Sequence, residues 1–413
     1  MPTLLTSLAN HDVWLDFLKV KTECGHTKKK ELSQLKQFVE KKLYADIANK
    51  IISGSYIFNP PAKTEINKSG STKKRVVYRF ERDETFVLKL VAHLLYKYDY
   101  VMSPACYSFR KHITAKNALD NITAIDCLSD KYVLKVDIHN YFNSIPADKL
   151  AEQINLTITD DEPLRKFLVD LVSTNKSIVY TIHGHPEIIT ENRGAMAGVP
   201  VSAFFANIYL GSLDKMFTDR AIPYFRYSDD IMVFADSETE ILEYKNIIFN
   251  HIEQKGLTIN SDKVKISKPS EEWEFLGFCY RNHRIDLASA TLTKIKAKIK
   301  RKAKALLRSR GRKNMSFDEA AANLIDHFNR KFYREFSDND FTWSRWFFPV
   351  ITTDESLKQI DEYLVEYVRF LRSGRHTKKN FEVSYDQIKE LGFKSLVNEY
   401  YKKRDVQNCT SLT

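Results

Sequence analysis

The stretch that decides the fold is YFRYSDDIMVFA, residues 224–235. Two runs of apolar and aromatic residues flank two adjacent aspartates, Asp229 and Asp230, and each run predicts a short strand. A tight hairpin turn usually contains Asn-Gly or Asp-Gly, so an Asp-Asp pair is unusual at this place. Taken alone, such a pair is most often a solvated acidic turn. A catalytic interpretation needs a third group from elsewhere in the chain.

Asp137 supplies that third group, because it directly follows the apolar run YVLKV, residues 132–136. A carboxylate at the end of a buried strand needs a compensating partner, since burying it alone is costly. One such partner is a lysine or arginine in a structural salt bridge. The other is a divalent cation shared with Asp229 and Asp230. Carboxylate oxygens suit Mg²⁺, and a pair of such ions assists both the attacking and the leaving oxygen of phosphoryl transfer.

Beyond the aspartates, longer phrases resemble the motifs of the reverse transcriptase family, and they occur in the family's order. They are VDIHNYFNSI (136–145), GAMAGVPVSAFFANIYL (194–210), Tyr-Ser-Asp-Asp (227–230), GLTINSDKVKI (256–266) and EFLGF (274–278). The resemblance covers roughly residues 55–280. It implies an RNA-directed DNA polymerase with an α+β fold, a right hand with an antiparallel RRM-like palm sheet, fingers and a helical basic thumb.

By this resemblance, residues of the palm take individual roles. Asp137, Asp229 and Asp230 would hold two Mg²⁺ ions, with the carbonyl of Ile138 as an auxiliary ligand. Phe142 lies at the position of an aromatic gate against the ribose 2′-hydroxyl, with plain core packing as the alternative. EFLGF resembles the hairpin that grips the primer strand.

Other residues would contact the nucleotide. Lys263 lies at the position of a general acid for the departing pyrophosphate, with a simple surface charge as the alternative. Lys68 and Arg75 match the fingers positions that clamp the triphosphate, a task that suits cationic forks. Gly198 and Ser202 belong to the motif that touches template and nucleotide. This motif departs from the family, because Met-Ala replaces Pro-Gln before the central glycine and Ser-Ala replaces Ser-Pro in the helix.

The composition indicates a soluble protein with an acidic partner. The chain has 413 residues, a net charge of +11 and a pI of about 9.1, which favours nucleic acid as that partner. Its five scattered cysteines form no Cys-x-x-Cys pair and predict reduced thiols in a cytoplasmic protein. The uncharged run 195–213 contains glycine and proline, so it predicts a loop entering a buried helix rather than a membrane span.

We expect three regions: an N-terminal helical region (1–54), fingers and palm (55–285), and a helical thumb with a C-terminal extension (286–413). Periodicity predicts helices over 28–52, 85–98 and 238–255, a largely helical stretch over 147–180, and a buried helix over 200–213. The aromatic run FTWSRWFFPVI, residues 341–351, is expected to pack within helices rather than stack on bases.

A basic stretch from Lys294 to Lys313 is the candidate thumb helix. It holds eleven lysines and arginines and no acidic residue. Such a helix would bind a duplex through its phosphates, without sequence preference and with strong salt dependence. The candidate contacts are Lys294, Lys298, Arg301 and Lys302, and a solvated helix face is the alternative.

Within the family, the small size, the departures in the second motif and the helical tail look most like bacterial abortive-infection and defence-associated reverse transcriptases. Retron enzymes are near neighbours, and no Cys/His zinc cluster of the intron-endonuclease kind follows the core. The implied partners are a dedicated non-coding RNA as template, dNTPs and a DNA product, in antiviral defence. Template-independent or protein-primed synthesis, and a non-catalytic RNA-binding or splicing-type scaffold, are the alternatives.

Overall fold

The computed structural model describes residues 3–23, 27–67, 74–181, 183–192, 194–333 and 342–410. The chain divides into two compact units, Met1–Pro269 and Ser270–Thr413. This division comes earlier in the chain than the expected boundary at residue 285, so EFLGF belongs to the second unit.

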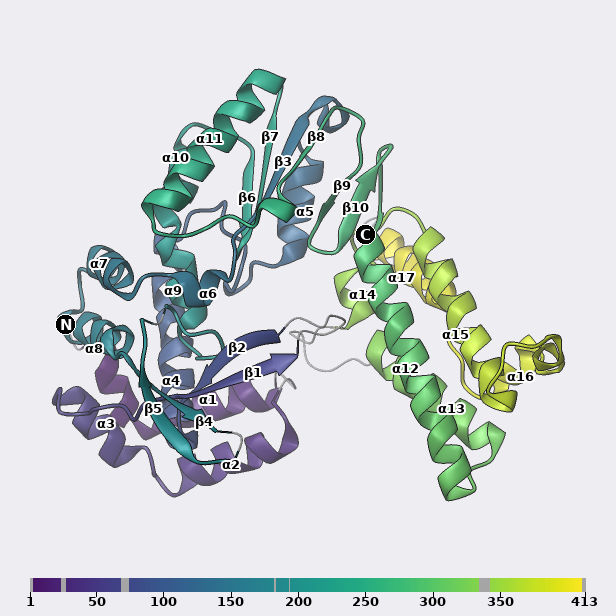
Figure 1. The fold of residues 1–413 in the computed structure, drawn as a ribbon, viewed down its shortest axis with the longest axis horizontal. Helices are drawn as coiled ribbons and strands as arrows, with labels where there is room; N and C mark the ends of the chain where they lie inside the picture. The colour runs from purple at the N-terminus through teal and green to yellow at the C-terminus, as the bar shows by residue number, and fades with distance from the viewer. Residues whose placement is uncertain are drawn as a thin grey trace. The chain divides into compact units, whose positions relative to one another are not determined.

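The palm sheet of the first unit is antiparallel and has the strand order β6-β7-β3-β8. Its strands are β3 (Tyr132–Asp137), β6 (Tyr224–Tyr227), β7 (Asp230–Ala235) and β8 (Lys265–Ser267). Figure 1 shows α10 (Gly211–Asp219) and α11 (Glu238–Gln254) beside these strands. Strands β3 and β7 are nearly continuous apolar runs because most of their residues, on both faces, are buried. The sheet thus provides a rigid support for its strand ends.

A second, mixed sheet has the order β2-β1-β4-β5 and corresponds to the fingers. Its strands are β1 (Ala62–Asn67), β2 (Lys74–Arg79), β4 (Lys176–Tyr180) and β5 (Pro186–Thr190). The helical prediction for 147–180 is correct for α7 (Ala147–Thr157) and α8 (Glu162–Ser173) but wrong for β4. The reason is long-range pairing, because β4 lies between β1 and β5. Helical periodicity does not reveal such partners.

Several predicted helices are divided in the structure. The stretch 28–52 forms α2 (Lys29–Glu40) and α3 (Ala45–Ile52), because Lys42 adopts a left-handed φ of 50° between them. The helix expected over 85–98 is α4 (Arg82–Leu94), continued by a 3-10 helix (Leu95–Val101). The buried helix expected over 200–213 is α9 (Ser202–Tyr209), followed by α10. The remaining helices of this unit are 3-10 helices at Leu4–Ala9, Leu128–Asp130 and Ser261–Lys263, with α1 (His11–Glu23), α5 (Ala115–Thr123) and α6 (Tyr141–Ser144).

The second unit begins with a three-stranded sheet of β9 (Trp273–Phe275), β10 (Phe278–Arg281) and β11 (Arg284–Leu287). Helices follow: α12 (Ser289–Lys313), α13 (Phe317–Tyr333), α14 (Trp343–Trp346), α15 (Glu355–Ser373), a 3-10 helix (Lys378–Glu382), α16 (Tyr385–Glu390) and α17 (Leu396–Thr410). Helix α12 packs on α13 and α15 through its buried face of Ile295, Ile299, Ala303 and Leu306. The predicted α+β class is confirmed.

Two further findings concern membrane spans and cysteines in the described part of the chain. None of its helices is long and apolar enough to cross a membrane. The thiols of Cys106, Cys127 and Cys279 are free.

Candidate active site

The three aspartates predicted to act together meet at one end of the palm sheet. Asp137 is the last residue of β3 and lies directly opposite Asp230, the first residue of β7. The Ile138 N–H donates to the Asp229 carbonyl at 3.2 Å, which ties the turn between β6 and β7 to the end of β3. Residues that directly face each other on an antiparallel pair are close neighbours. Strand register therefore brings together carboxylates about ninety residues apart in the chain.

The surroundings of this cluster disfavour negative charge on Asp229 and Asp230. Burial raises the pKa of Asp230 to about 6, and the charges of Asp229 and Asp137 add to the effect, whereas Lys135 opposes it. Burial also raises the pKa of Asp229, with a further contribution from Asp137. Both burial and neighbouring carboxylates therefore disfavour the charged forms of Asp229 and Asp230. A bound divalent cation would favour those charged forms, so the residues fit a metal site electrostatically.

Asp137 has protein partners of its own. Lys263 Nζ donates to Asp137 Oδ2 at 2.6 Å, and Asn260 Nδ2 donates to Oδ1 at 3.1 Å. Among the residues that the structure describes, no group of three or more His, Cys, Asp or Glu side chains is arranged ready to hold a metal ion. The Lys263 side chain is 49% exposed, whereas that of Asp137 is 8% exposed. The lysine can therefore swing away from a carboxylate that the sheet keeps in place.

The predicted sugar gate, Phe142, lies half-buried in α6. Its ring meets Phe109 edge-on, with centroids 6.1 Å apart, and Phe109 lies 6.4 Å from the ring of Tyr227. Phe109 itself is 44% exposed and has a left-handed φ of 54°. These aromatic contacts link Phe142, through Phe109, to Tyr227, which precedes the turn that carries Asp229 and Asp230. Its action on the sugar stays a prediction.

The loop before α9 is held by backbone contacts. Gly198 has φ +99°, and a Cβ there would lie 3.0 Å from the Tyr78 carbonyl oxygen, so only glycine fits without strain. Ser202 is buried, and its hydroxyl donates to the carbonyl of Met196, 2.6 Å away, or of Ala195. Ser202 therefore shapes the loop, and contact of either residue with a nucleotide stays a prediction.

The fingers residues are placed only in part. Arg75 is exposed in β2, opposite Ile66 of β1. Lys68 lies outside the residues that the structure describes. The Asn143 amide links this sheet to the loop before α9, because it donates to the Val76 carbonyl at 3.1 Å and accepts from the Ala197 N–H at 2.9 Å.

The basic helix α12 keeps many of its cations on the surface. Lys294 and Arg301 are exposed, and Lys298 and Lys302 are half-buried. Residues 270–413 hold 28 lysines and arginines against 20 aspartates and glutamates, so most of the net charge of +11 lies in this unit. This distribution favours the second unit as the part that meets a polyanion.

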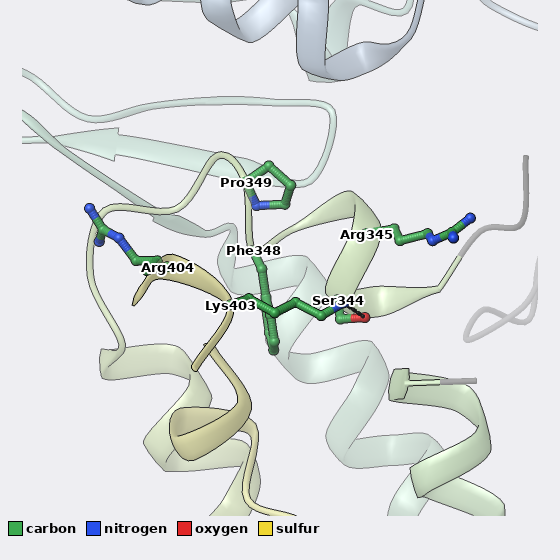
Figure 2. A pocket seen from close by; sticks show the side chains of 6 residues that line it. All are labelled: Ser344, Arg345, Phe348, Pro349, Lys403 and Arg404. Carbon is green, nitrogen blue, oxygen red and sulfur yellow. Dashed lines mark hydrogen bonds between the residues drawn. The ribbon is translucent and has the colours of Figure 1, made fainter. Parts of the chain in front are cut away.

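A basic pocket of about 160 Å³ lies elsewhere in the second unit, between the α14 region and α17. Figure 2 shows its lining, which is Ser344, Arg345, Phe348, Pro349, Lys403 and Arg404. Lys403 reaches across Phe348 to the Ser344 hydroxyl, while the two arginines extend on opposite sides of Phe348. Of the aromatic run, Phe348 is buried against Tyr400 of α17, but it lies in the turn after α14 rather than within a helix.

Sequence reasoning missed two polar side chains around the carboxylates. Asn260 and Lys135 both act on the cluster, the first by a hydrogen bond and the second by its charge. The sequence contained a signal for each residue. Asn260 lies in the same motif as Lys263. Lys135 is two residues before Asp137 on the same strand and therefore faces the same side.

A palm sheet with carboxylates gathered at its strand ends is the arrangement expected of a polymerase-type nucleotidyltransferase. Residues 66–280 match the model of the family described as "Reverse transcriptase (RNA-dependent DNA polymerase)". Because the match covers more than half of the chain, the chain belongs to the reverse transcriptase family. The predicted family, and with it the enzyme class of RNA-directed DNA polymerase, is confirmed.

Two curated relatives are retron reverse transcriptases of Escherichia coli. The chain is 24% identical to the retron Ec86 enzyme over 243 residues, covering 57% of this chain and 67% of the relative. It is 26% identical to the retron Ec83 enzyme over 184 residues, covering 42% and 54%. A solved structure of apo telomerase from Candida tropicalis, truncated from its C-terminal domain, is 13% identical with a TM-score of 0.45, over 60% of each chain.

Proposed function

We propose that this chain synthesises DNA on an RNA template, with Asp137, Asp229 and Asp230 holding two Mg²⁺ ions. The observation that supports the proposal most is the convergence of three carboxylates at one end of the sheet, two of which, Asp229 and Asp230, have pKa values raised by burial and by their carboxylate neighbours. Two such ions would activate the primer hydroxyl and stabilise the departing pyrophosphate. The Ile138 carbonyl, next to Asp137, is proposed as an auxiliary ligand.

The remaining residues of the site would bind and orient the substrates. Lys263, released from Asp137, would be free to donate a proton to the pyrophosphate oxygen as a general acid. Arg75, with Lys68, would hold the triphosphate in the fingers through charge-assisted hydrogen bonds. Phe142 would exclude a 2′-hydroxyl by its bulk, since it is kept in place by Phe109.

The nucleic acid would be held chiefly by the second unit. The exposed cations of α12, among them Lys294 and Arg301, would neutralise phosphates of the primer–template duplex. The basic pocket between the α14 region and α17 would contribute further phosphate contacts. A contact of this kind gives affinity without base recognition, so the choice of template would depend on the shape of the RNA.

The test of the reaction is incorporation of labelled dNTPs by purified protein in Mg²⁺, with and without an RNA template and primer. Templated incorporation that Asp229→Ala abolishes is the expected result. Incorporation that survives prior RNase treatment would favour untemplated or protein-primed synthesis. Absence of incorporation together with tight RNA binding would favour a non-catalytic scaffold. Lys263→Ala is expected to slow incorporation, and Lys263→Arg to restore part of it.

We further propose that the template is a dedicated non-coding RNA and that its copying serves antiviral defence. The proposal is supported by similarity to retron reverse transcriptases and by the departures at Met196 and Ala197. Sequencing the nucleic acid that co-purifies with the protein should return one enriched RNA and its DNA copy. Phage resistance should be lost with Asp229→Ala, and resistance that persists in this variant would contradict the defence role.

A further inference from the structure

The turn that holds Asp229 and Asp230 rests on a buried ion pair. Arg226 of β6 and Asp214 of α10 are both 0% exposed. Arg226 Nε donates to Asp214 Oδ1 at 2.6 Å, and Nη2 donates to Oδ2, so the guanidinium holds the carboxylate with two parallel bonds. The Tyr224 hydroxyl donates to the same carboxylate at 2.9 Å. Only arginine presents this planar fork, and the pair fixes its orientation.

The same guanidinium reaches the catalytic turn. Arg226 Nη1 donates to the Ser228 carbonyl at 3.3 Å. The Ser228 N–H donates to Ser108 Oγ at 2.9 Å, and that hydroxyl donates to Asn207 Oδ1 at 2.8 Å. Both peptide groups of Ser228 are therefore held by buried polar groups. Ser228 has φ +62°, a conformation that residues other than glycine rarely adopt, so it requires such support.

Stability alone does not account for this arrangement. A buried ion pair stabilises a fold weakly, because the loss of hydration offsets much of the attraction between the charges. Apolar residues of similar volume often give an equally stable core. Arg226 Nη2 also donates to the Asn207 carbonyl at 3.0 Å and to Cys106 Sγ at 3.3 Å, so part of its role is to join α9 to β6. Its contact with the carbonyl of Ser228, the residue immediately before Asp229, extends this support to the position of the carboxylates.

The charge of the pair also matters. A lone guanidinium three residues before Asp229 would repel a cation bound by the turn. Asp214 cancels this charge while leaving the donors of Arg226 in place. The pair thus supplies directed hydrogen bonds without adding a net charge beside the carboxylates.

We propose that Arg226, held by Asp214, is the positioning residue of the catalytic turn. It fixes the Ser228 peptide so that Asp229 and Asp230 face Asp137, and Asp214 keeps its charge from opposing cation binding. This inference deepens the proposed function and rests on it for the use of the site.

Three variants separate position from charge. Asp214→Asn leaves the guanidinium uncompensated and should raise the Mg²⁺ concentration for half-maximal incorporation by about tenfold. Arg226→Lys keeps the charge but loses the fork, so incorporation should fall about tenfold or more with a nearly unchanged Mg²⁺ requirement. The double variant Asp214→Leu/Arg226→Met should keep the thermal stability and primer–template binding of the wild type but lose incorporation.

Two controls make the result specific. Asp99→Asn breaks another arginine–carboxylate pair, with Arg110, and should leave the Mg²⁺ requirement unchanged. Mn²⁺ binding, followed by electron paramagnetic resonance, reports on the site without turnover and should be weaker in Asp214→Asn than in wild type. Asp229→Ala defines the signal of a lost site.

The outcomes decide as follows. Wild-type incorporation in the double variant would overturn the inference. An Asp214→Asn variant that is less stable, but that needs no more Mg²⁺ for incorporation and binds Mn²⁺ as the wild type does, would also overturn it. Either result, with an active wild type, leaves the proposed function intact. A wild type that neither incorporates dNTPs nor binds Mn²⁺ would instead refute the proposed function, and this inference with it.

Discussion

Replacement of Asp230 by asparagine is expected to stabilise the protein in the absence of metal. Burial and the neighbouring carboxylates raise the pKa of this group from 3.8 to about 6. The folded protein therefore keeps a proton on Asp230 that the unfolded chain releases, and stability is lost as the pH rises from 3.8 through about 6. A shift of about two pKa units corresponds to about 3 kcal/mol at pH 8. Asparagine carries no charge and avoids this loss.

The assay is denaturant unfolding in EDTA at two pH values. The free energy of unfolding should be about 3 kcal/mol higher in Asp230→Asn at pH 8, but only about 1 kcal/mol higher at pH 4.5, where the folded wild type is protonated. Mg²⁺ should stabilise the wild type and not the variant. Asp236→Asn, which changes an exposed carboxylate just after the last residue of β7, is the matched control and should change stability little. Equal effects at both pH values, or a destabilised variant at pH 8, would refute the reasoning.

Three other perturbations test separate parts of the molecule. Phe142→Val should raise the ratio of ribonucleotide to deoxyribonucleotide incorporation by about tenfold or more, and an unchanged ratio would return this residue to a packing role. Replacing Lys294 and Arg301 by glutamate should weaken primer–template binding and make the negative slope of log K against log salt shallower by roughly two. Binding measured at several salt concentrations gives this slope. Gly198→Ala should destabilise the first unit by about 1–3 kcal/mol in the same unfolding assay, because the added Cβ would lie 3.0 Å from the Tyr78 carbonyl oxygen. Gly184→Ala is the control and should destabilise it less, because a Cβ there meets open space.

Much of the palm could be predicted from the sequence, because its signals are local. The apolar runs on either side of Asp229-Asp230 form β6 and β7 as expected, and the run before Asp137 forms β3. The motif order then predicted which strands lie together. Elements that depend on distant pairing were missed, as β4 shows, since its neighbours β1 and β5 stabilise a strand next to two helices.

The support beneath the catalytic turn could not be predicted for a related reason. Nothing in the sequence indicates that Ser108 binds Ser228, or that Asp214 holds the arginine that does so. The sequence does not distinguish a buried arginine such as Arg226 from one on the surface. Only the packing of α9 and α10 under the palm strands shows that its charge and donors are used. Likewise, the pairing of Lys263 with Asp137 depends on the register of β8 with β3.

The most direct test of the whole account is anomalous diffraction from crystals of the protein with Mn²⁺, primer–template and a non-hydrolysable dNTP. We predict two manganese peaks coordinated by Asp137, Asp229 and Asp230, with Lys263 moved off Asp137. A map without peaks at these carboxylates, in which Lys263 still occupies Asp137, would contradict it.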